Sequence, residues 1–316
     1  METNNTLSAI RRPTESMLHI NKEEGYIWCS LFLLEAIIIV VLNMFTIIVF
    51  TKDRHVRKRS TYLLINLSAA DIGVGGFVIP TAVFSRGNTY RLWNVEMIPA
   101  WFISTYGVDM LFLGCSLAFL VSISVERLYA TRSPMRHLSM TEVAYKIWMS
   151  CVWVASFIYT TAVVLFLFYD IIGLQIWYVV ASCVFGSLLI LTFSYSAIFV
   201  TVRCSKQPQH DHRGQAWKER RLTMTLFIVT LVSLSVWMPY VLFTFLESHL
   251  SRYFSEETIL RARGVCELLF FANSFVNPIL YTIRMPLFRK ASINLIACCR
   301  NSRVRQTTSL SPETVR

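Results

Sequence analysis

Residues 27–51 read IWCSLFLLEAIIIVVLNMFTIIVFT, an apolar run in which Glu35 is the one charged residue. An α-helix needs about 20 predominantly apolar residues to cross roughly 30 Å of hydrocarbon, so this run is long enough to span a membrane. Similar runs follow along the chain at 61–83, 97–129, 144–168, 172–203, 219–247 and 262–284. The sequence therefore predicts an all-α membrane protein, a seven-transmembrane helix bundle.

The composition of the chain is that of a membrane protein. Of its 316 residues, 54% are hydrophobic and 16% are charged, whereas about a quarter of the residues in soluble domains are charged. The net charge of +11 would suggest a nucleic-acid partner in a soluble protein. Here the basic residues gather on one side of the expected membrane, so we expect no nucleic-acid partner.

The distribution of Lys and Arg predicts the orientation. With residue 1 outside, the inner segments hold 22 of the 30 basic residues, at 52–59, 127–146, 203–221 and 284–316. Because cytoplasmic loops are enriched in Lys and Arg, we expect a plasma-membrane protein with an extracellular N-terminus and a cytoplasmic C-terminus. Asn4, in the triplet Asn4-Asn5-Thr6, is then a glycosylation acceptor. The expected regions are an extracellular tail at 1–26, the transmembrane domain at 27–297 and a cytoplasmic tail at 298–316.

Several ionisable residues fall inside the apolar runs. A charge at the bilayer centre costs at least about 2.5–3.5 kcal/mol, so such residues usually face the bundle interior and serve a function. In the third run, Asp109, Ser116 and Arg127 are spaced by seven and eleven residues, which places them on one helix face. This stripe predicts a central helix with Asp109 near the outer mouth and Arg127 at the inner surface. The alternative is a stripe of purely structural hydrogen bonds.

A series of motifs, in order and each in its expected helix, resembles those of rhodopsin-like (class A) G protein-coupled receptors over residues 27–297. They are Asn43, Leu67 to Asp71, Glu126-Arg127-Leu128 with Pro134 and Met135 after it, Trp153, Trp237-Met238-Pro239, Asn277-Pro278 to Tyr281, and Phe288-Arg289-Lys290. The resemblance implies a receptor, not an enzyme, that converts binding of an extracellular ligand into activation of a heterotrimeric G protein. It also implies a short amphipathic eighth helix starting near Phe288.

The resemblance implies further site residues. One buried group would hold an allosteric sodium ion, since a carboxylate with neutral oxygens suits a small hard cation; its members are Asp71, Ser116, Asn273, Ser274 and Asn277. The alternative is a water-filled hydrogen-bond network. No other cofactor is expected.

The resemblance also implies an activation switch at the inner end. Arg127 would pair with Glu219 and with its neighbour Glu126 at rest, and would be freed to meet the G protein. Pro239 cannot donate a backbone hydrogen bond and should kink the sixth helix. The remaining residues of this group are Tyr195 and Tyr281, which would turn inward, and Pro134 and Met135, which would contact the G protein.

Two departures from the family pattern narrow the subgroup. Phe102 stands where the family has its third-helix cysteine, and Ser187 stands where it has a fifth-helix proline. Loss of both features resembles the melanocortin, cannabinoid and lysophospholipid receptor group. The third-helix cysteine of the family forms an extracellular disulfide, which this chain therefore lacks. Cys29 and Cys266 lie near the outer ends of helices expected to be neighbours, so a substitute disulfide between these two residues is one option.

The ligand class stays open between two interpretations. Asp109 stands where amine receptors bind the ammonium of the ligand, and Trp237, Tyr240 and Phe271 could form an aromatic cage for a cation. Glu267 and Glu247 add acidity that would equally suit a basic peptide, and the subgroup resemblance favours a peptide or lysolipid. We favour a cationic amine.

The sequence also bears on two alternative functions, light sensing and transport, and on modification of the C-terminal tail. Light sensing is disfavoured because residues 262–284 contain no lysine for a Schiff base. A polytopic transporter is the alternative outside the receptors. Cys298 and Cys299 are placed for palmitoylation beside membrane lipids. Phosphorylation could recruit arrestin through Thr307, Thr308, Ser309 and Ser311.

Overall fold

The computed structural model describes residues 21–308 except 54–55, 57–58, 97, 170–175, 205–230, 233–234 and 248; at 99–100, 102, 176–181, 202–204 and 298–308 it describes the backbone alone. Every regular element in this part of the chain is a helix. The elements are α2 (Lys22–Lys52), α3 (Thr61–Gly73), η1 (Val74–Val78), α4 (Ile79–Thr89), α5 (Pro99–Arg132), α6 (Pro134–Ser139), α7 (Glu142–Phe168), α8 (Ile176–Cys204), α10 (Glu256–Arg284) and α11 (Pro286–Thr308), with a further helical segment at 235–247.

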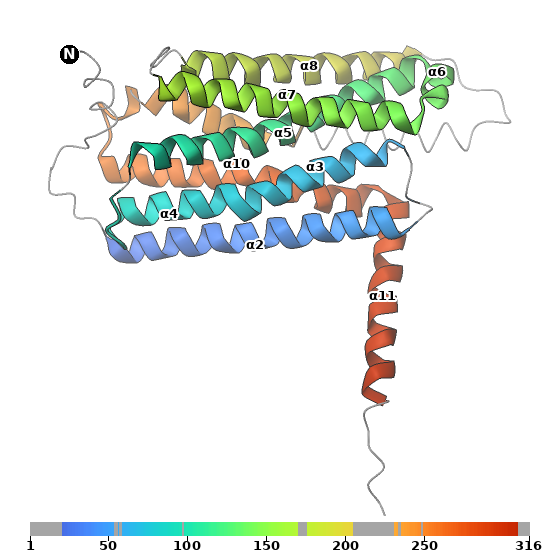
Figure 1. Cartoon of the computed structure of the whole chain (residues 1–316), viewed down its shortest axis with the longest axis horizontal. Coiled ribbons are helices and arrows are strands. Elements are labelled where there is room, and N and C mark those ends of the chain that lie inside the picture. The colour runs from blue at the N-terminus through green and yellow to red at the C-terminus, as the bar shows by residue number, and fades with distance from the viewer. Residues whose placement is uncertain are drawn as a thin grey trace, which may run out of the picture.

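The long helices lie side by side in one bundle, and α11 leaves it crosswise (Figure 1). Six helices in the described residues are long and apolar enough to cross a membrane. They correspond to six of the seven predicted runs, and the other run, 219–247, lies largely outside the described residues. The prediction of an all-α membrane protein is confirmed.

Helix α5 lies in the middle of the bundle, as its polar stripe predicts. It contacts α3, η1, α7 and α8 along its length. Between α3 and α7, the indole Nε1 of Trp153 donates to Asn66 Oδ1 at 3.0 Å, which ties the fourth-helix tryptophan to the second helix.

Helix ends differ from the predicted ones because caps, rather than the apolar run, decide where a helix begins. Helix α2 begins at Lys22, where Asn21 Oδ1 accepts from the backbone nitrogen of Glu23 at 3.0 Å. At the other end of the chain, α11 continues to Thr308 and therefore past the predicted boundary at 297.

The second membrane helix contains a π-helical turn that the apolar pattern does not reveal. It joins α3 to α4 at Val74–Val78 and precedes Pro80, whose nitrogen cannot donate. One extra residue in a turn rotates everything after it by about 100° relative to a regular helix. The turn therefore sets which side chains of α4 face the bundle.

The end of the bundle where α2 begins, which the sequence predicts to be the outer end, is held together by a shared carboxylate. Glu24 accepts from Arg261 at 2.9 Å, from Trp28 at 3.2 Å and from the Tyr90 hydroxyl at 3.4 Å, which joins α2, α10 and the end of α4. Cys29 is a free thiol that donates to the Val83 carbonyl at 3.8 Å, and Cys266 is also free. The substitute disulfide is therefore not formed in this structure.

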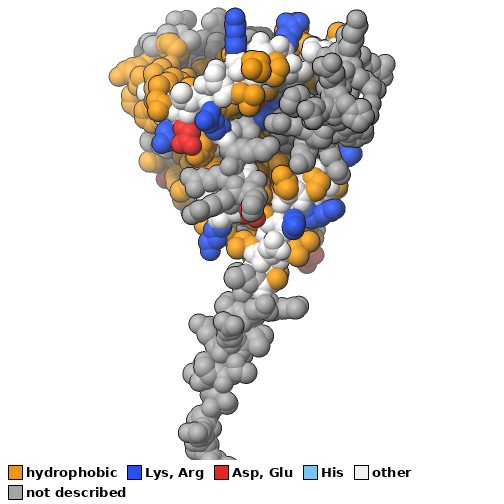
Figure 2. Space-filling view, turned by 90° about the vertical axis from the view of Figure 1, so that its right-hand side faces the viewer, with side chains coloured by type: hydrophobic (Ala, Val, Ile, Leu, Met, Phe, Trp, Pro, Cys, Tyr) orange, Lys and Arg blue, Asp and Glu red, His pale blue; other side chains and the backbone are white. Residues whose placement is uncertain are grey.

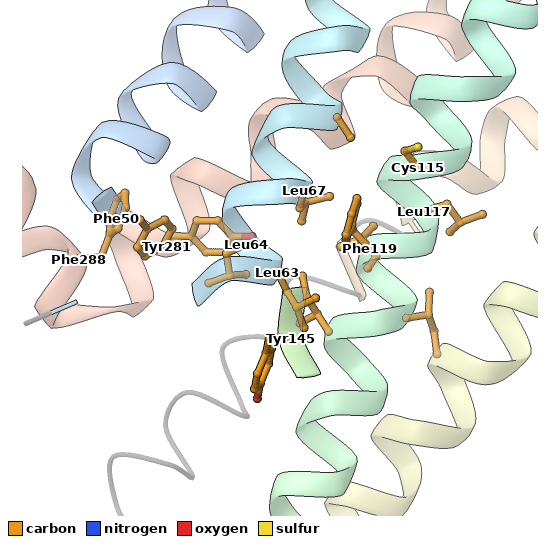
Figure 3. Close-up of a cluster of buried hydrophobic side chains, with 14 of the residues drawn as sticks. Phe50, Leu63, Leu64, Leu67, Cys115, Leu117, Phe119, Tyr145, Tyr281 and Phe288 are labelled. Carbon is orange, nitrogen blue, oxygen red and sulfur yellow. The ribbon is translucent and has the colours of Figure 1, made fainter. Parts of the chain in front are cut away.

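An apolar cluster fills the inner half of the bundle (Figure 3). At one side, the ring of Phe288 lies 5.0 Å from that of Phe50 and 6.2 Å from that of Tyr281. These contacts pack the first turn of α11 against α2 and α10. The other labelled members are Leu63, Leu64, Leu67, Cys115, Leu117, Phe119 and Tyr145.

Close packing around the π turn generates a test of stability. A methyl group at Gly73 would collide with the ring of Phe112, which also stacks on Phe77. We expect Gly73→Ala to destabilise the protein by about 1–3 kcal/mol through overpacking. Gly76→Ala is the matched control, because nothing lies within 4 Å of its added methyl group. Thermal unfolding of the two purified variants measures the difference, and equal melting temperatures would contradict the packing described.

Candidate functional site

The inner end of α5 carries a buried carboxylate with several partners. Glu126 is 1% exposed, and its Oε2 lies 2.6 Å from Nε of Arg127. Its Oε1 lies 2.7 Å from Nε2 of His137 in α6 and accepts from the Tyr145 hydroxyl in α7 at 2.8 Å. One carboxylate thus joins three helices at this end of the bundle. Sequence reasoning anticipated the pair with Arg127 and missed the other two partners.

The other residues predicted for the switch and for the G protein contact are placed as follows. Tyr195 and Tyr281 are buried, at 3% and 1% exposed, and Pro239 lies in the helical segment 235–247. Pro134 begins α6, and the next residue, Met135, is 79% exposed. Figure 2 shows this end of the molecule, with Lys and Arg side chains between hydrophobic patches. Glu219 lies outside the described residues.

Asp71 forms the polar centre of the bundle. It is fully buried and accepts from Ser116 at 2.8 Å, from Ser274 at 2.9 Å and from Asn277 at 3.3 Å. Asn273 is also buried, but no hydrogen bond joins it to Asp71 among the described contacts. The structure thus brings together four of the five residues predicted to hold sodium.

A cavity of about 230 Å³ opens near the outer end, where α4, α5 and α10 meet. Asp109 and Glu267, two of the five predicted ligand residues, line it. The other residues of its wall were not predicted from the sequence motifs. They are Thr81, Ala82, Ser85, Arg86, Thr89, Tyr90, Thr105, Leu260 and Arg263.

The predicted aromatic residues Trp237, Tyr240 and Phe271 do not line this cavity. Phe271 is 5% exposed and packs edge-on against Phe32, with ring centroids 6.0 Å apart. Its neighbour Phe270 instead meets Trp237 at 5.0 Å and Tyr240 at 4.6 Å. Adjacent residues on a helix point about 100° apart. Phe270 therefore faces Trp237 and Tyr240, and Phe271, the next residue, faces Phe32 instead.

The acidic residues at the mouth already have partners. Glu267 forms an ion pair with Arg86, whose guanidinium lies 5.5 Å from the ring centroid of Trp28 and 4.9 Å from that of Phe32. Glu247 forms an ion pair with Arg263. Sequence reasoning missed Arg86, which lies just beyond the predicted run 61–83. The sequence feature that could have indicated Arg86 is its position, a single arginine about one turn past the end of an apolar run.

Several predicted positions lie outside the residues or side chains that the structure describes. They are Asn4, Phe102, Glu219, Cys298, Cys299 and the tail hydroxyls at 307–311.

Comparison with known proteins shows the family of the chain. The family model described as 7 transmembrane receptor (rhodopsin family) matches residues 42–172 and 169–281. The chain belongs to this family. As a family member, it is a G protein-coupled receptor and a multi-pass membrane protein rather than an enzyme. The subgroup named from the missing cysteine and proline remains a prediction.

Individual receptors are similar over most of the chain. A blue-sensitive opsin of Anolis carolinensis is 23% identical over 82% of this chain and 77% of its own length. A trace amine-associated receptor 365 of Petromyzon marinus is 24% identical over 79% and 73%. A histamine H2 receptor of Canis lupus familiaris is 27% identical over 82% and 76%.

The two ion pairs at the outer end should differ in their contribution to stability. Replacing one partner of a buried pair leaves an unpaired charge, at a cost of about 3–5 kcal/mol, whereas exposed pairs contribute about 0–1 kcal/mol. The side chains of Arg86 and Glu267 are 8% and 18% exposed, against 42% and 27% for Arg263 and Glu247. We therefore expect Glu267→Gln to lower the melting temperature of the purified receptor clearly more than the matched change Glu247→Gln. Equal losses would contradict this assignment.

Proposed function

We propose that this receptor binds a small ligand with a cationic amine group in the outer cavity and transmits binding to a G protein. The observation that carries the proposal is Asp109: it lines the cavity, and its buried Oδ1 has no hydrogen-bond partner among the described residues. A buried carboxylate oxygen without a partner is unfavourable. A ligand ammonium would supply both the countercharge and the hydrogen bonds.

Other ligand classes fit the cavity less well. A basic peptide would use Glu247 and Glu267, but both already form ion pairs with arginines. A lysolipid needs an apolar wall for its chain, and Ala82 and Leu260 are the only aliphatic residues of the wall in the described part of the chain. Among the similar proteins are a trace amine-associated, an adrenergic and a histamine receptor, and their names favour an amine.

Light sensing and transport have less support. Opsins are among the similar proteins, but α10 contains no lysine to which retinal could be joined. A transporter would not be expected to match the receptor family over most of the chain.

For the inner end, we propose that the Glu126–Arg127 pair is the resting arrangement. Activation would release Arg127 toward the G protein, with the exposed Met135 at the contact surface. Glu219 would be the further resting partner of Arg127, and Tyr195 and Tyr281 would turn toward the arginine. This arrangement requires the N-terminus outside the plasma membrane and α6 in the cytoplasm, as the basic residues predict.

The amine anchor predicts a loss of potency in Asp109→Asn. A charge-assisted hydrogen bond contributes about 1.5–3 kcal/mol, which corresponds to roughly 10–100-fold in potency. A panel of amines, basic peptides and lysolipids, read by guanine nucleotide exchange on the G protein, measures this change. Glu35→Gln is the matched control, because Glu35 is another buried acid of the bundle that does not line the cavity. Amine responses that survive Asp109→Asn would refute the anchor.

We also propose that the Asp71 pocket holds a sodium ion in the resting state. Binding to one state stabilises that state by RT ln(1 + [Na⁺]/Kd). Sodium chloride should therefore raise the melting temperature of the receptor more than an equal concentration of N-methylglucamine chloride, and Asp71→Asn should remove the difference. Equal effects of the two salts on the unmodified receptor would indicate a water-filled network instead.

A further inference from the structure

The wall of the outer cavity carries two acids and two arginines. Asp109 and Glu267 are negative, and Arg86 and Arg263 are positive. The formal charges of the wall cancel, but Arg263 is paired with Glu247, which lies outside the wall. A ligand ammonium therefore meets Asp109, and a ligand that also carries an anionic group can take the place of Glu247 on Arg263.

One of the arginines is fixed in place. Arg86 is 8% exposed, is paired with Glu267 and lies against the rings of Trp28 and Phe32. A methyl group at Gly264 would lie 2.8 Å from its Nη1, so the α10 backbone closes the remaining side. Arg86 and Glu267 therefore neutralise each other and leave Asp109 and Arg263 to meet a ligand.

The other arginine can change its partner. The side chain of Arg263 is 42% exposed, and its partner Glu247 is 27% exposed and does not line the cavity. An exposed ion pair contributes about 0–1 kcal/mol, so exchanging Glu247 for an anionic group of a ligand costs little. A guanidinium also binds a carboxylate through two parallel hydrogen bonds, which adds geometric selectivity.

A row of hydroxyl groups lies along the same cavity. Thr81, Ser85 and Thr89 follow at intervals of four on α4, so the first and last are about 12 Å apart along the helix. Thr81 donates to the Val78 carbonyl at 2.7 Å and Thr89 to the Ser85 carbonyl at 3.1 Å. The Thr81 hydroxyl also lies within hydrogen-bond reach of the Asp109 carboxylate, and the oxygen of Thr89, whose proton is used, remains an acceptor for an N–H donor.

We propose that the ligand is a small zwitterion, such as an amino acid, with its ammonium on Asp109 and its carboxylate on Arg263. The proposal rests on the amine anchor described above and adds the second charge. In this proposal, Arg263 distinguishes an amino acid from the corresponding amine. Glu247 binds Arg263 in the empty receptor and competes there with the carboxylate of the ligand.

Matched probes test the second charge. Tyrosine and tyramine, histidine and histamine, and 4-aminobutanoate and propylamine each differ by one carboxylate. Nucleotide exchange on the G protein and thermal stabilisation of the purified receptor would be measured with each compound up to millimolar concentration. In at least one pair, the member with the carboxylate should be 10-fold or more the stronger ligand.

Variants identify the residue responsible. Arg263→Gln should remove the advantage of the carboxylate and leave the amine unchanged, whereas Glu247→Gln should increase the advantage by freeing Arg263. Arg261→Gln is the matched control, because Arg261 lies on the same helix, binds Glu24 and does not line the cavity. It should leave the ratio within each pair unchanged.

The outcomes separate the two proposals. If the amine is the stronger member of each active pair and Asp109→Asn abolishes its effect, the zwitterion is wrong and the amine anchor stands. If responses to both members survive Asp109→Asn, both proposals are wrong. If no probe activates or stabilises the receptor, or if Arg261→Gln changes the ratio as much as Arg263→Gln, the assignment of Arg263 is overturned.

Discussion

An ionisable side chain among apolar helices must find a partner, because neither lipid nor a packed core can solvate it. Much of the bundle is arranged by this requirement. Asp71 draws donors from α5 and α10, and Glu126 draws them from α5, α6 and α7. Arg86 joins α4 to α10 through Glu267. The contacts of Asp71 and of Arg86 join helices that are far apart in the sequence, so these buried polar groups help to fix which helix faces meet.

The central helix α5 places these groups at successive levels along the bundle. Asp109 lies at the outer cavity, Ser116 at the polar centre and Arg127 at the inner pair, all on one face of α5. Seven and eleven residues separate them, or roughly 10 and 17 Å along the helix. A change at the cavity and a change at the inner pair therefore act on one rigid element, which is the property that a two-state signalling protein needs.

At the outer end, hydrogen bonds to one carboxylate join the helix ends of a chain that lacks the family's extracellular disulfide. Glu24 receives hydrogen bonds from three side chains on α2, α10 and the residue after α4, and no disulfide joins Cys29 to Cys266 in this structure. Such a carboxylate cluster holds helix ends together without a covalent bond. Glu35 is an exception to the pairing requirement, since its Oε2 has no hydrogen-bond partner among the described residues.

The sequence alone determined the number and course of the described membrane helices, because a span depends only on the length of an apolar run. Spacing along one helix determined the central place of α5, whereas the pair Glu126–Arg127 was expected from the resemblance to the family motif. The tertiary structure decided the rest: the π turn, the choice of Phe270 over Phe271 beside Trp237, and the partners of Glu247 and Glu267. These depend on how one helix is rotated against another. Periodicity within a single helix carries no record of that rotation, so residues as distant in sequence as Arg86 and Glu267 meet only in the folded bundle.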